Sequence, residues 1–295
     1  MFIFKIVVFV LLLWYLLTVL IIGRYLAYHD MFVPRKKPDG SIELQGYDYR
    51  DVQFRGVEGI ALKGWFIKSR DNPTNKTLFV IPGWTRTRSR YLAQIKFFVN
   101  SGFHVFTYDQ RSHGSSDTAR ITFGPKEGED LLAATDYAKS LEDVNAEKLA
   151  AVGFSLGASA AIYAGTAHVF RALVLEGVFA DSYDIGEEIL IRRFGQPLAK
   201  IIGYGIFWVG TMLWTLGKYR HSHPVEFISR VSPTPVMIIR GQGDVRAPEK
   251  SAQLILDVAK EPKTIWVHKG GHTQAYNQYP QEYKEKVLGF LNTYL

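Results

Sequence analysis

The chain of 295 residues contains no cysteine, which excludes a disulfide framework and any metal site built on thiolates. It also lacks low-complexity tracts and internal repeats, so one large hydrophobic core, alone or with an insertion, is the expected organisation. A dense basic stripe with interleaved aromatics is absent too, although the net charge is +7. Nucleic acid is therefore not an expected partner. A mildly basic protein beside an anionic membrane fits this charge better.

Charge is also missing from residues 6–22, where every side chain except Thr18 is apolar. A run of this length lies at the lower limit of a membrane-spanning helix. A cleaved signal peptide is the alternative, but the apolar region is long for one and no small-residue cleavage site follows it. We therefore expect residues 1–23 to form an uncleaved transmembrane anchor and residues 24–46 to form a linker.

Basic residues follow the apolar segment, whereas only Lys5 and the amino terminus precede it. The positive-inside rule then favours a single-pass protein whose C-terminal body faces the cytoplasm. Most of these charges lie well beyond the segment, so an exported body stays an alternative. The basic residues that follow it are Arg24, Arg35, Lys36 and Lys37.

From residue 47 onward, short apolar runs alternate with amphipathic patterns. The alternation predicts an α/β domain over residues 47–295, with a mainly parallel sheet covered by helices on both faces. Its first two strands are expected to form an antiparallel pair. The expected strands are 47–54, 60–67, 77–81, 104–108, 149–152, 172–175, 235–239 and 264–267. The expected helices are 90–99, 126–141, one directly after residue 155, 249–259 and 281–295.

The most informative stretch is Gly153-Phe154-Ser155-Leu156-Gly157, which follows an apolar run and precedes a run of small residues. A G-x-S-x-G sequence between a strand and a helix is typical of a tight turn that exposes a nucleophilic serine. Ser155 by itself could equally be a helix N-cap. The catalytic interpretation therefore depends on partner residues elsewhere in the chain.

Two suitable partners follow in the chain, each just beyond a predicted strand. Asp244 comes after the strand at 235–239, and His272 comes after the strand at 264–267. A serine hydroxyl needs an imidazole base, which in turn needs a carboxylate to fix its tautomer. Because reactive groups collect at the carboxyl ends of parallel strands, we predict that Ser155, Asp244 and His272 form a catalytic triad.

Two backbone amides are needed to stabilise the oxyanion of such a reaction. The amide of Leu156 follows the nucleophile directly and opens the next helix. The second donor is expected in the loop after residues 77–81, where Gly83 permits close approach, and we assign it to the amide of Trp84.

With these residues in place, the chain from Tyr47 to Leu295 resembles the α/β-hydrolase superfamily. It looks most like the serine aminopeptidase-like or dienelactone-hydrolase-like branch, whose members often carry an N-terminal anchor. The segment Tyr-Asp-Gln-Arg-Ser-His-Gly-Ser-Ser at 108–116 is similar to the family's segment after the fourth strand. The resemblance implies that Asp109, Arg111 and His113 brace the loops of the site.

The sequence differs from many members of the family in the oxyanion loop, and family members differ from one another in the position of the catalytic acid. Many members have His-Gly in the oxyanion loop where this chain has Pro82-Gly83. Some members place the acid after the preceding strand, where Glu176 and Asp181 stand here. The Gly-x-Gly-Asp context favours Asp244.

Between about residues 182 and 230 the alternation breaks, which indicates a helical cap inserted in the domain. Residues 201–216 are almost wholly apolar. A buried cap helix, a lipid-facing lid and a second membrane span are the alternatives for them. Either cap would roof Ser155 with apolar side chains, and such pockets favour acyl chains. His221 and His223 lack a nearby acidic pair and are interpreted as structural.

These observations predict a membrane-anchored serine hydrolase that cleaves carboxylic esters, lipid esters among them. The expected partners are a small-molecule or lipid ester and the lipid bilayer, with no metal and no organic cofactor. A serine peptidase is the enzymatic alternative, and it would need an acidic site such as Glu187-Glu188 for a substrate amine. The alternative of another class is a non-catalytic membrane scaffold that kept the fold.

Overall fold

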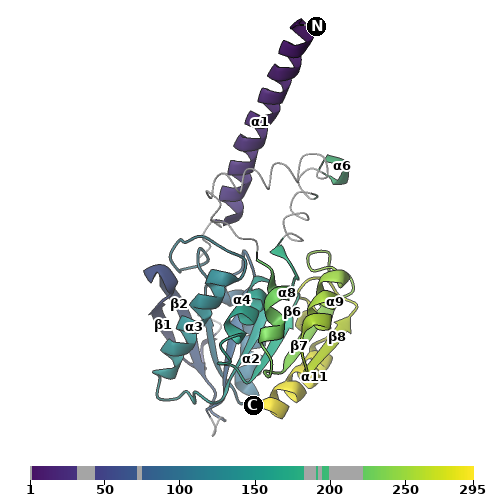
Figure 1. Ribbon diagram of the computed structural model, residues 1–295. Coiled ribbons are helices and arrows are strands. Elements are labelled where there is room, and N and C mark those ends of the chain that lie inside the picture. Colours follow the sequence, from purple (N-terminus) through teal and green to yellow (C-terminus); the bar gives the residue numbers. More distant parts are fainter. Residues whose placement is uncertain (1, 32–43, 72–74, 183–190, 192–194, 199–221) are drawn as a thin grey trace.

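The structure, a computed structural model, describes residues 2–31, 44–71, 75–182, 191, 195–198 and 222–295. Within these residues, eight strands form one sheet in the order β1-β2-β4-β3-β5-β6-β7-β8 (Figure 1). Strand β2 runs antiparallel to β1 and to β4, and all other neighbouring strands pair in parallel. The predicted mainly parallel sheet flanked by helices is therefore confirmed.

The predicted strands and helices of the body begin and end within two residues of the expected positions. The strands are β1 (Asp48–Arg55), β2 (Ala61–Lys68), β3 (Thr77–Ile81), β4 (His104–Tyr108), β5 (Leu149–Phe154), β6 (Ala172–Glu176), β7 (Val236–Gly241) and β8 (Lys263–His268). The helices are α2 (Leu92–Asn100), α3 (Pro125–Lys139), α4 (Leu156–Gly165), α9 (Glu249–Val258) and α11 (Pro280–Tyr294). Short helical turns that the sequence did not signal are η2 (Val57–Gly59), η3 (Arg88–Tyr91), α6 (Gln196–Leu198), α8 (Pro224–Phe227), η5 (Ile228–Arg230) and α10 (Ala275–Gln278).

Both faces of the sheet are apolar, because the central strands consist mostly of apolar residues whose side chains alternate between the two faces. In β3, Leu78 and Val80 face a core that includes α2 and α11, whereas Phe79 and Ile81 face a core that includes α3, α4 and α9. This two-sided burial explains why the central strands read as continuous apolar runs rather than alternating ones. It also leaves the ends of the strands as the place where polar side chains can gather.

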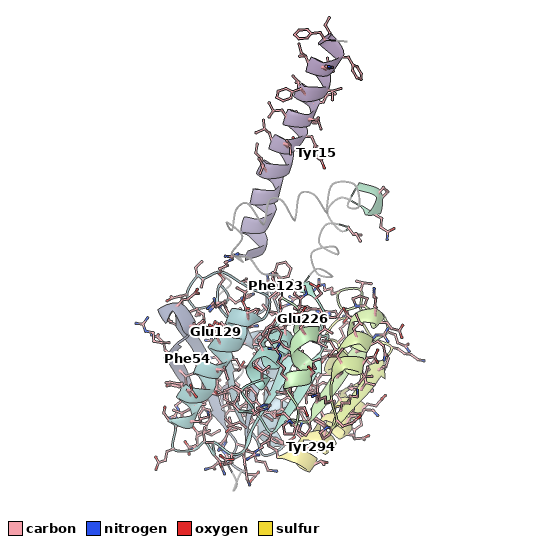
Figure 2. The ribbon with its side chains drawn as sticks, in the orientation of Figure 1. Tyr15, Phe54, Phe123, Glu129, Glu226 and Tyr294 are labelled. Carbon is pink, nitrogen blue, oxygen red and sulfur yellow. The ribbon has the colours of Figure 1, made fainter. Side chains whose placement is uncertain are left out.

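The predicted N-terminal helix is present as α1 (Phe2–Met31), so it runs into the predicted linker 24–46. It projects from the body, and its apolar side chains, such as Tyr15 in Figure 2, are exposed. However, no helix in the described part of the chain is both long and apolar enough to cross a membrane, so the transmembrane span predicted at 1–23 is not supported.

Most of the predicted cap at 182–230, including the apolar stretch 201–216 and His221, lies outside the described residues. The described end of this segment, α8 and η5, packs on the body, where the ring of Phe227 lies 4.4 Å from that of Tyr163 in α4. His223 pairs with Asp181 at 2.9 Å, which agrees with a structural interpretation. The domain division stays a prediction.

A buried ion pair ties the segment after β4 to helix α3. The Arg111 guanidinium donates from Nε and Nη2 to the two oxygens of Asp130 at 2.8 and 3.0 Å, and both side chains are buried. Burial raises the pKa of Asp130 to about 6, against the opposing effect of Arg111.

We predict that Asp130→Ala lowers the free energy of unfolding by about 3–5 kcal/mol, because it leaves a buried guanidinium without its bidentate partner. Asp136→Ala is the matched control on the same helix, since its pair with Lys139 is exposed, and it should cost less than about 1 kcal/mol. Urea denaturation followed by circular dichroism measures both, and equal losses would contradict the prediction.

Candidate active site

Ser155 occupies a strained turn between β5 and α4. Its backbone has φ 53° and ψ −112°, a combination that non-glycine residues adopt at a cost. The flanking glycines are required by space: a Cβ on Gly157 would lie 2.2 Å from the carbonyl oxygen of Ile81, and one on Gly153 would lie 2.4 Å from the carbonyl oxygen of Gly157. The G-x-S-x-G sequence thus forms the expected tight turn at the carboxyl end of β5.

His272 and Asp244 are paired beyond the ends of β8 and β7. The Nδ1 atom of His272 lies 2.8 and 2.9 Å from the two carboxylate oxygens of Asp244, whose side chain is fully buried. The Oδ1 atom also accepts the amides of Arg246 and Ala247, each at 2.9 Å. Because an ionised carboxylate only accepts, the proton of a neutral imidazole at this position is on Nδ1, and Nε2 then has the free lone pair.

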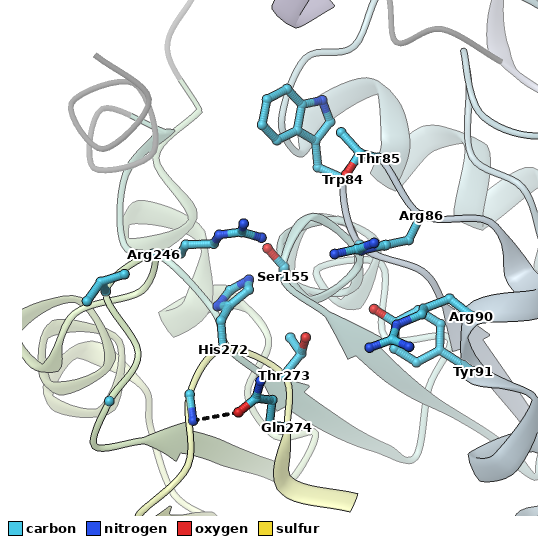
Figure 3. Close-up of a pocket in the computed structure, with 14 residues that line it drawn as sticks. Trp84, Thr85, Arg86, Arg90, Tyr91, Ser155, Arg246, His272, Thr273 and Gln274 are labelled. Atoms are coloured by element: carbon cyan, nitrogen blue, oxygen red, sulfur yellow. Dashed lines mark hydrogen bonds between the residues drawn. The ribbon is translucent and has the colours of Figure 1, made fainter. Parts of the chain in front are cut away.

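Ser155 and His272 line the same pocket, a cavity of about 550 Å³ that we call the Ser155 pocket. Figure 3 shows the imidazole next to the serine side chain. The ring is packed closely from the end of β6, since a Cβ on Gly177, which has φ +65°, would lie 3.0 Å from Cε1 of His272. The fold therefore brings the three predicted triad residues together from the loops after β5, β7 and β8.

The loop after β3 approaches the serine as predicted for an oxyanion loop. A Cβ on Gly83 would lie 3.3 Å from the Cβ of Ser155, so the backbone at 83–84 passes directly beside the nucleophile. Among the described hydrogen bonds, neither the amide of Leu156 nor that of Trp84 is a donor. The two amides assigned to the oxyanion hole stay a prediction that this loop geometry favours.

The segment after β4 fixes the loop after β3. The amide of Thr85 donates to Nε2 of His113 at 2.9 Å, and the amide of Arg88 donates to Oδ1 of Asp109 at 2.9 Å. The Arg88 guanidinium also forms a buried ion pair with Asp109. Burial lowers the pKa of His113, so the ring is neutral and its Nε2 accepts. These contacts are the bracing that the resemblance implied for Asp109 and His113, whereas Arg111 pairs with Asp130 in α3.

The two alternative acids have other partners. Glu176, at the end of β6, is fully buried, and its Oε1 accepts the amide of Ala275 at 3.0 Å. Burial raises the pKa of Glu176 to about 8, so at neutral pH it is a protonated acid rather than a carboxylate. Asp181 pairs with His223. Of the three candidates, Asp244 is the one that contacts His272.

The sequence did not single out several pocket residues. Arg86, Arg90 and Tyr91 line the Ser155 pocket from the loop after β3, and Arg246 lines it from the loop after β7. The alternation Arg86, Arg88, Arg90 was a readable signal, but which of these side chains faces the pocket depends on the fold of the loop.

An eight-stranded sheet of this order, with a strained serine and a paired histidine and aspartate at its carboxyl edge, defines the class of α/β-hydrolase-fold proteins. The particular family follows from sequence comparison. The model of the alpha/beta hydrolase family matches residues 78–286, and the chain belongs to that family. The narrower assignment to the aminopeptidase-like branch is not supported by this match.

Relatives of similar length exist in bacteria. The chain is 26% identical to the protein YfhR of Salmonella typhi over 95% of this chain and 94% of that protein. It is 24% identical to YqkD of Bacillus subtilis, with 93% of each chain covered. Among solved structures it is similar to an esterase of Pyrococcus furiosus, Pf2001, with a TM-score of 0.72, 22% identity, and coverage of 89% and 99%. This last likeness concerns the fold alone.

The raised pKa of Glu176 has a measurable consequence for stability. The pKa of this acid is about 8 in the folded state but close to 4.5 in the unfolded state. The unfolded state therefore loses the proton at a lower pH than the folded state does. The free energy of unfolding should therefore fall as pH rises from about 4.5 to 8, by on the order of 3–5 kcal/mol in total.

We predict that Glu176→Gln, which keeps a neutral side chain at every pH, removes most of this fall. Urea denaturation between pH 5 and 8.5 measures the slope for both proteins, with Glu129→Gln on the exposed side of α3 as the control. A slope in Glu176→Gln equal to that of the unsubstituted protein would contradict the prediction.

Proposed function

We propose that this protein is a serine hydrolase that cleaves carboxylic esters through an acyl-enzyme on Ser155. The observation that carries the proposal is the hydrogen bond between His272 and the buried Asp244 in a pocket shared with the strained Ser155. This arrangement supplies a nucleophile, a base with its lone pair available, and a carboxylate that stabilises the imidazolium.

In the first half-reaction, the Ser155 oxygen attacks the ester carbonyl while Nε2 of His272 takes the hydroxyl proton. The carbonyl oxygen becomes an oxyanion, which the amides of Leu156 and Trp84 stabilise. The carbon–oxygen bond to the alcohol then breaks, and His272 returns the proton to the departing oxygen.

In the second half-reaction, a water molecule gives its proton to His272 and attacks the acyl-enzyme. The bond to Ser155 breaks, the serine oxygen regains the proton, and the carboxylic acid leaves. Throughout, Asp244 stays ionised and holds the imidazole by its Nδ1–H.

The lining of the pocket supports an ester over a substrate that carries an amine. Among its described residues none is acidic and three are arginines, so a substrate ammonium group would find no counter-charge. Glu187 and Glu188, the acidic residues that could bind the amine of a peptidase substrate, lie outside the described residues. We therefore keep ester hydrolysis as the proposal and treat amide cleavage as an outcome to be tested.

The test is covalent labelling combined with steady-state kinetics. A fluorophosphonate probe should label the unsubstituted protein at Ser155 and leave Ser155→Ala unlabelled. Asp244→Asn should lower kcat for p-nitrophenyl esters by about 10³–10⁴-fold. The amides of Arg246 and Ala247 hold the carbonyl oxygen of the new side chain at the position of Oδ1, so its NH₂ group takes the position of Oδ2, 2.8 Å from Nδ1, where it favours the wrong tautomer.

Asp181→Asn is the matched control, because Asp181 was the other aspartate proposed as the acid, and it should retain nearly full activity. Absence of labelling at Ser155 would favour the non-catalytic scaffold. A large loss in Asp181→Asn with full activity in Asp244→Asn would overturn the assignment of the acid. Aminoacyl-nitroanilides tested beside the esters distinguish a peptidase.

We further infer that α1 holds the protein at a lipid bilayer, which would bring the Ser155 pocket near lipid esters. The support is a helix whose apolar side chains are exposed, including Phe9, Leu12 and Trp14, since soluble proteins rarely expose so much contiguous apolar surface. The basic residues that follow the apolar part of α1 favour a body on the cytoplasmic side.

Replacing Leu12 and Leu16 together by Glu should move most of the protein from the carbonate-resistant membrane fraction to the soluble one. Each charge placed within an apolar helix costs about 2.5–3.5 kcal/mol of insertion free energy. Leu254→Glu, an exposed leucine on α9, is the control and should leave the distribution unchanged. Protease protection of the body in closed vesicles reports its side of the membrane, and fully soluble unsubstituted protein would overturn the inference.

A further inference from the structure

The Ser155 pocket has a strongly positive lining. Arg86 and Arg90 approach it from the loop after β3, and Arg246 approaches it from the loop after β7. Figure 3 shows Arg86 and Arg246 reaching toward Ser155 from opposite sides, with Arg90 beside Tyr91. The described lining contains no Asp or Glu, and the carboxylate of Asp244 is buried behind His272.

Ion pairs account for four other arginines of the body. Each of these pairs with a carboxylate: Arg88 with Asp109, Arg111 with Asp130, Arg171 with Glu147, and Arg240 with Glu249. Within the described residues, Arg86 and Arg90 pair with no carboxylate. Among the described residues, the charges of Arg86 and Arg90 at the pocket are therefore not balanced by an ion pair.

The backbone that carries Arg86 and Arg90 is held in place by the ion pair of Arg88 and by hydrogen bonds within the loop. Arg88, between them in sequence, turns inward to its buried pair with Asp109, while Arg86 and Arg90 turn outward. The amides of Arg86 and Arg90 donate to the carbonyls of Gly83 and Thr87, each at 3.1 Å. On the opposite side, the amide of Arg246 is held by the triad carboxylate. The side chains of Arg86, Arg90 and Arg246 therefore extend from backbone positions that are fixed around Ser155.

We propose that this pocket selects esters that carry an anionic group, a carboxylate or a phosphate, a few bonds from the scissile carbonyl, and that Arg86 and Arg90 bind that group. The inference rests on the proposed ester hydrolysis and names its substrate class. The planar guanidinium matches both anions with paired N–H donors, which makes arginine the suitable residue for this recognition. Exposed charges also steer anionic substrates toward the pocket, an effect that salt weakens.

The experiment compares matched esters on the full-length protein. Mono-p-nitrophenyl adipate and p-nitrophenyl hexanoate differ by a terminal carboxylate, and 1-oleoylglycerol 3-phosphate and 1-oleoylglycerol differ by a phosphate. We expect kcat/KM to favour the anionic member by about tenfold or more in at least one pair, less so at high salt. A preference confined to the adipate pair identifies a soluble carboxylate ester, and one confined to the phosphate pair identifies a phospholipid-like substrate.

The double variant Arg86→Gln/Arg90→Gln should lower kcat/KM for the preferred anionic ester by about tenfold or more, and change the neutral partner by less than about threefold. The double variant Arg55→Gln/Arg171→Gln is the control, because it removes the same charge from exposed residues that do not line the pocket, and it should preserve the preference. Equal kcat/KM within both pairs, or equal losses for both members, would overturn the inference.

A binding measurement separates this inference from the proposed reaction. In Ser155→Ala, calorimetry should show tighter binding of the preferred anionic ester than of its neutral partner, and Arg86→Gln/Arg90→Gln in that background should abolish the difference. If hydrolysis is absent but this difference is found, the proposed reaction fails and the anion site stands. If neutral esters are hydrolysed and no difference is found, the anion site fails and the proposed reaction stands.

Discussion

The candidate site depends on one close contact between two stretches of backbone. The turn at Ser155 presses against the end of β3 so tightly that a side chain at position 157 would collide with the carbonyl of Ile81. This contact sets the distance between the nucleophile and the loop at Gly83, and so determines where an oxyanion could be bound. The unfavourable φ of Ser155 is maintained because β5 and α4 are held on either side by the buried core.

Polar groups hold the loops that the core cannot reach. Asp109 binds the amide and the guanidinium of Arg88, and His113 binds the amide of Thr85, so the segment after β4 anchors the loop beside the serine. A buried ion pair contributes little net stability compared with apolar packing. Here its consequence is geometric: it fixes one arginine inward and thereby directs its neighbours toward the pocket.

Two carboxyl groups that lie near one another at the site differ in their hydrogen-bond partners and in their pKa. Asp244 has His272 and two backbone amides as partners. Glu176 is buried with a single described bond to the amide of Ala275, and its raised pKa keeps it neutral. A second carboxylate so close to Asp244 would be repelled by it. The fold thus keeps one negative charge behind the imidazole and leaves the pocket itself positive.

Much of this protein is determined locally along the chain. Short apolar runs between turn signals, such as Thr77–Ile81, favour buried strands, and because parallel strands end at one edge, Ser155, Asp244 and His272 could be expected to meet there. The sequence context already favoured Asp244 over Glu176, but the raised pKa of Glu176, the inward turn of Arg88 and the outward turn of Arg86 could not be expected, since each depends on burial and on partners far away in sequence. The spacing of apolar side chains can be read from the sequence. Desolvation of a buried group, and the way in which side chains from separate loops face one another, exist only in the folded chain, and these two effects determine which charges lie at the site.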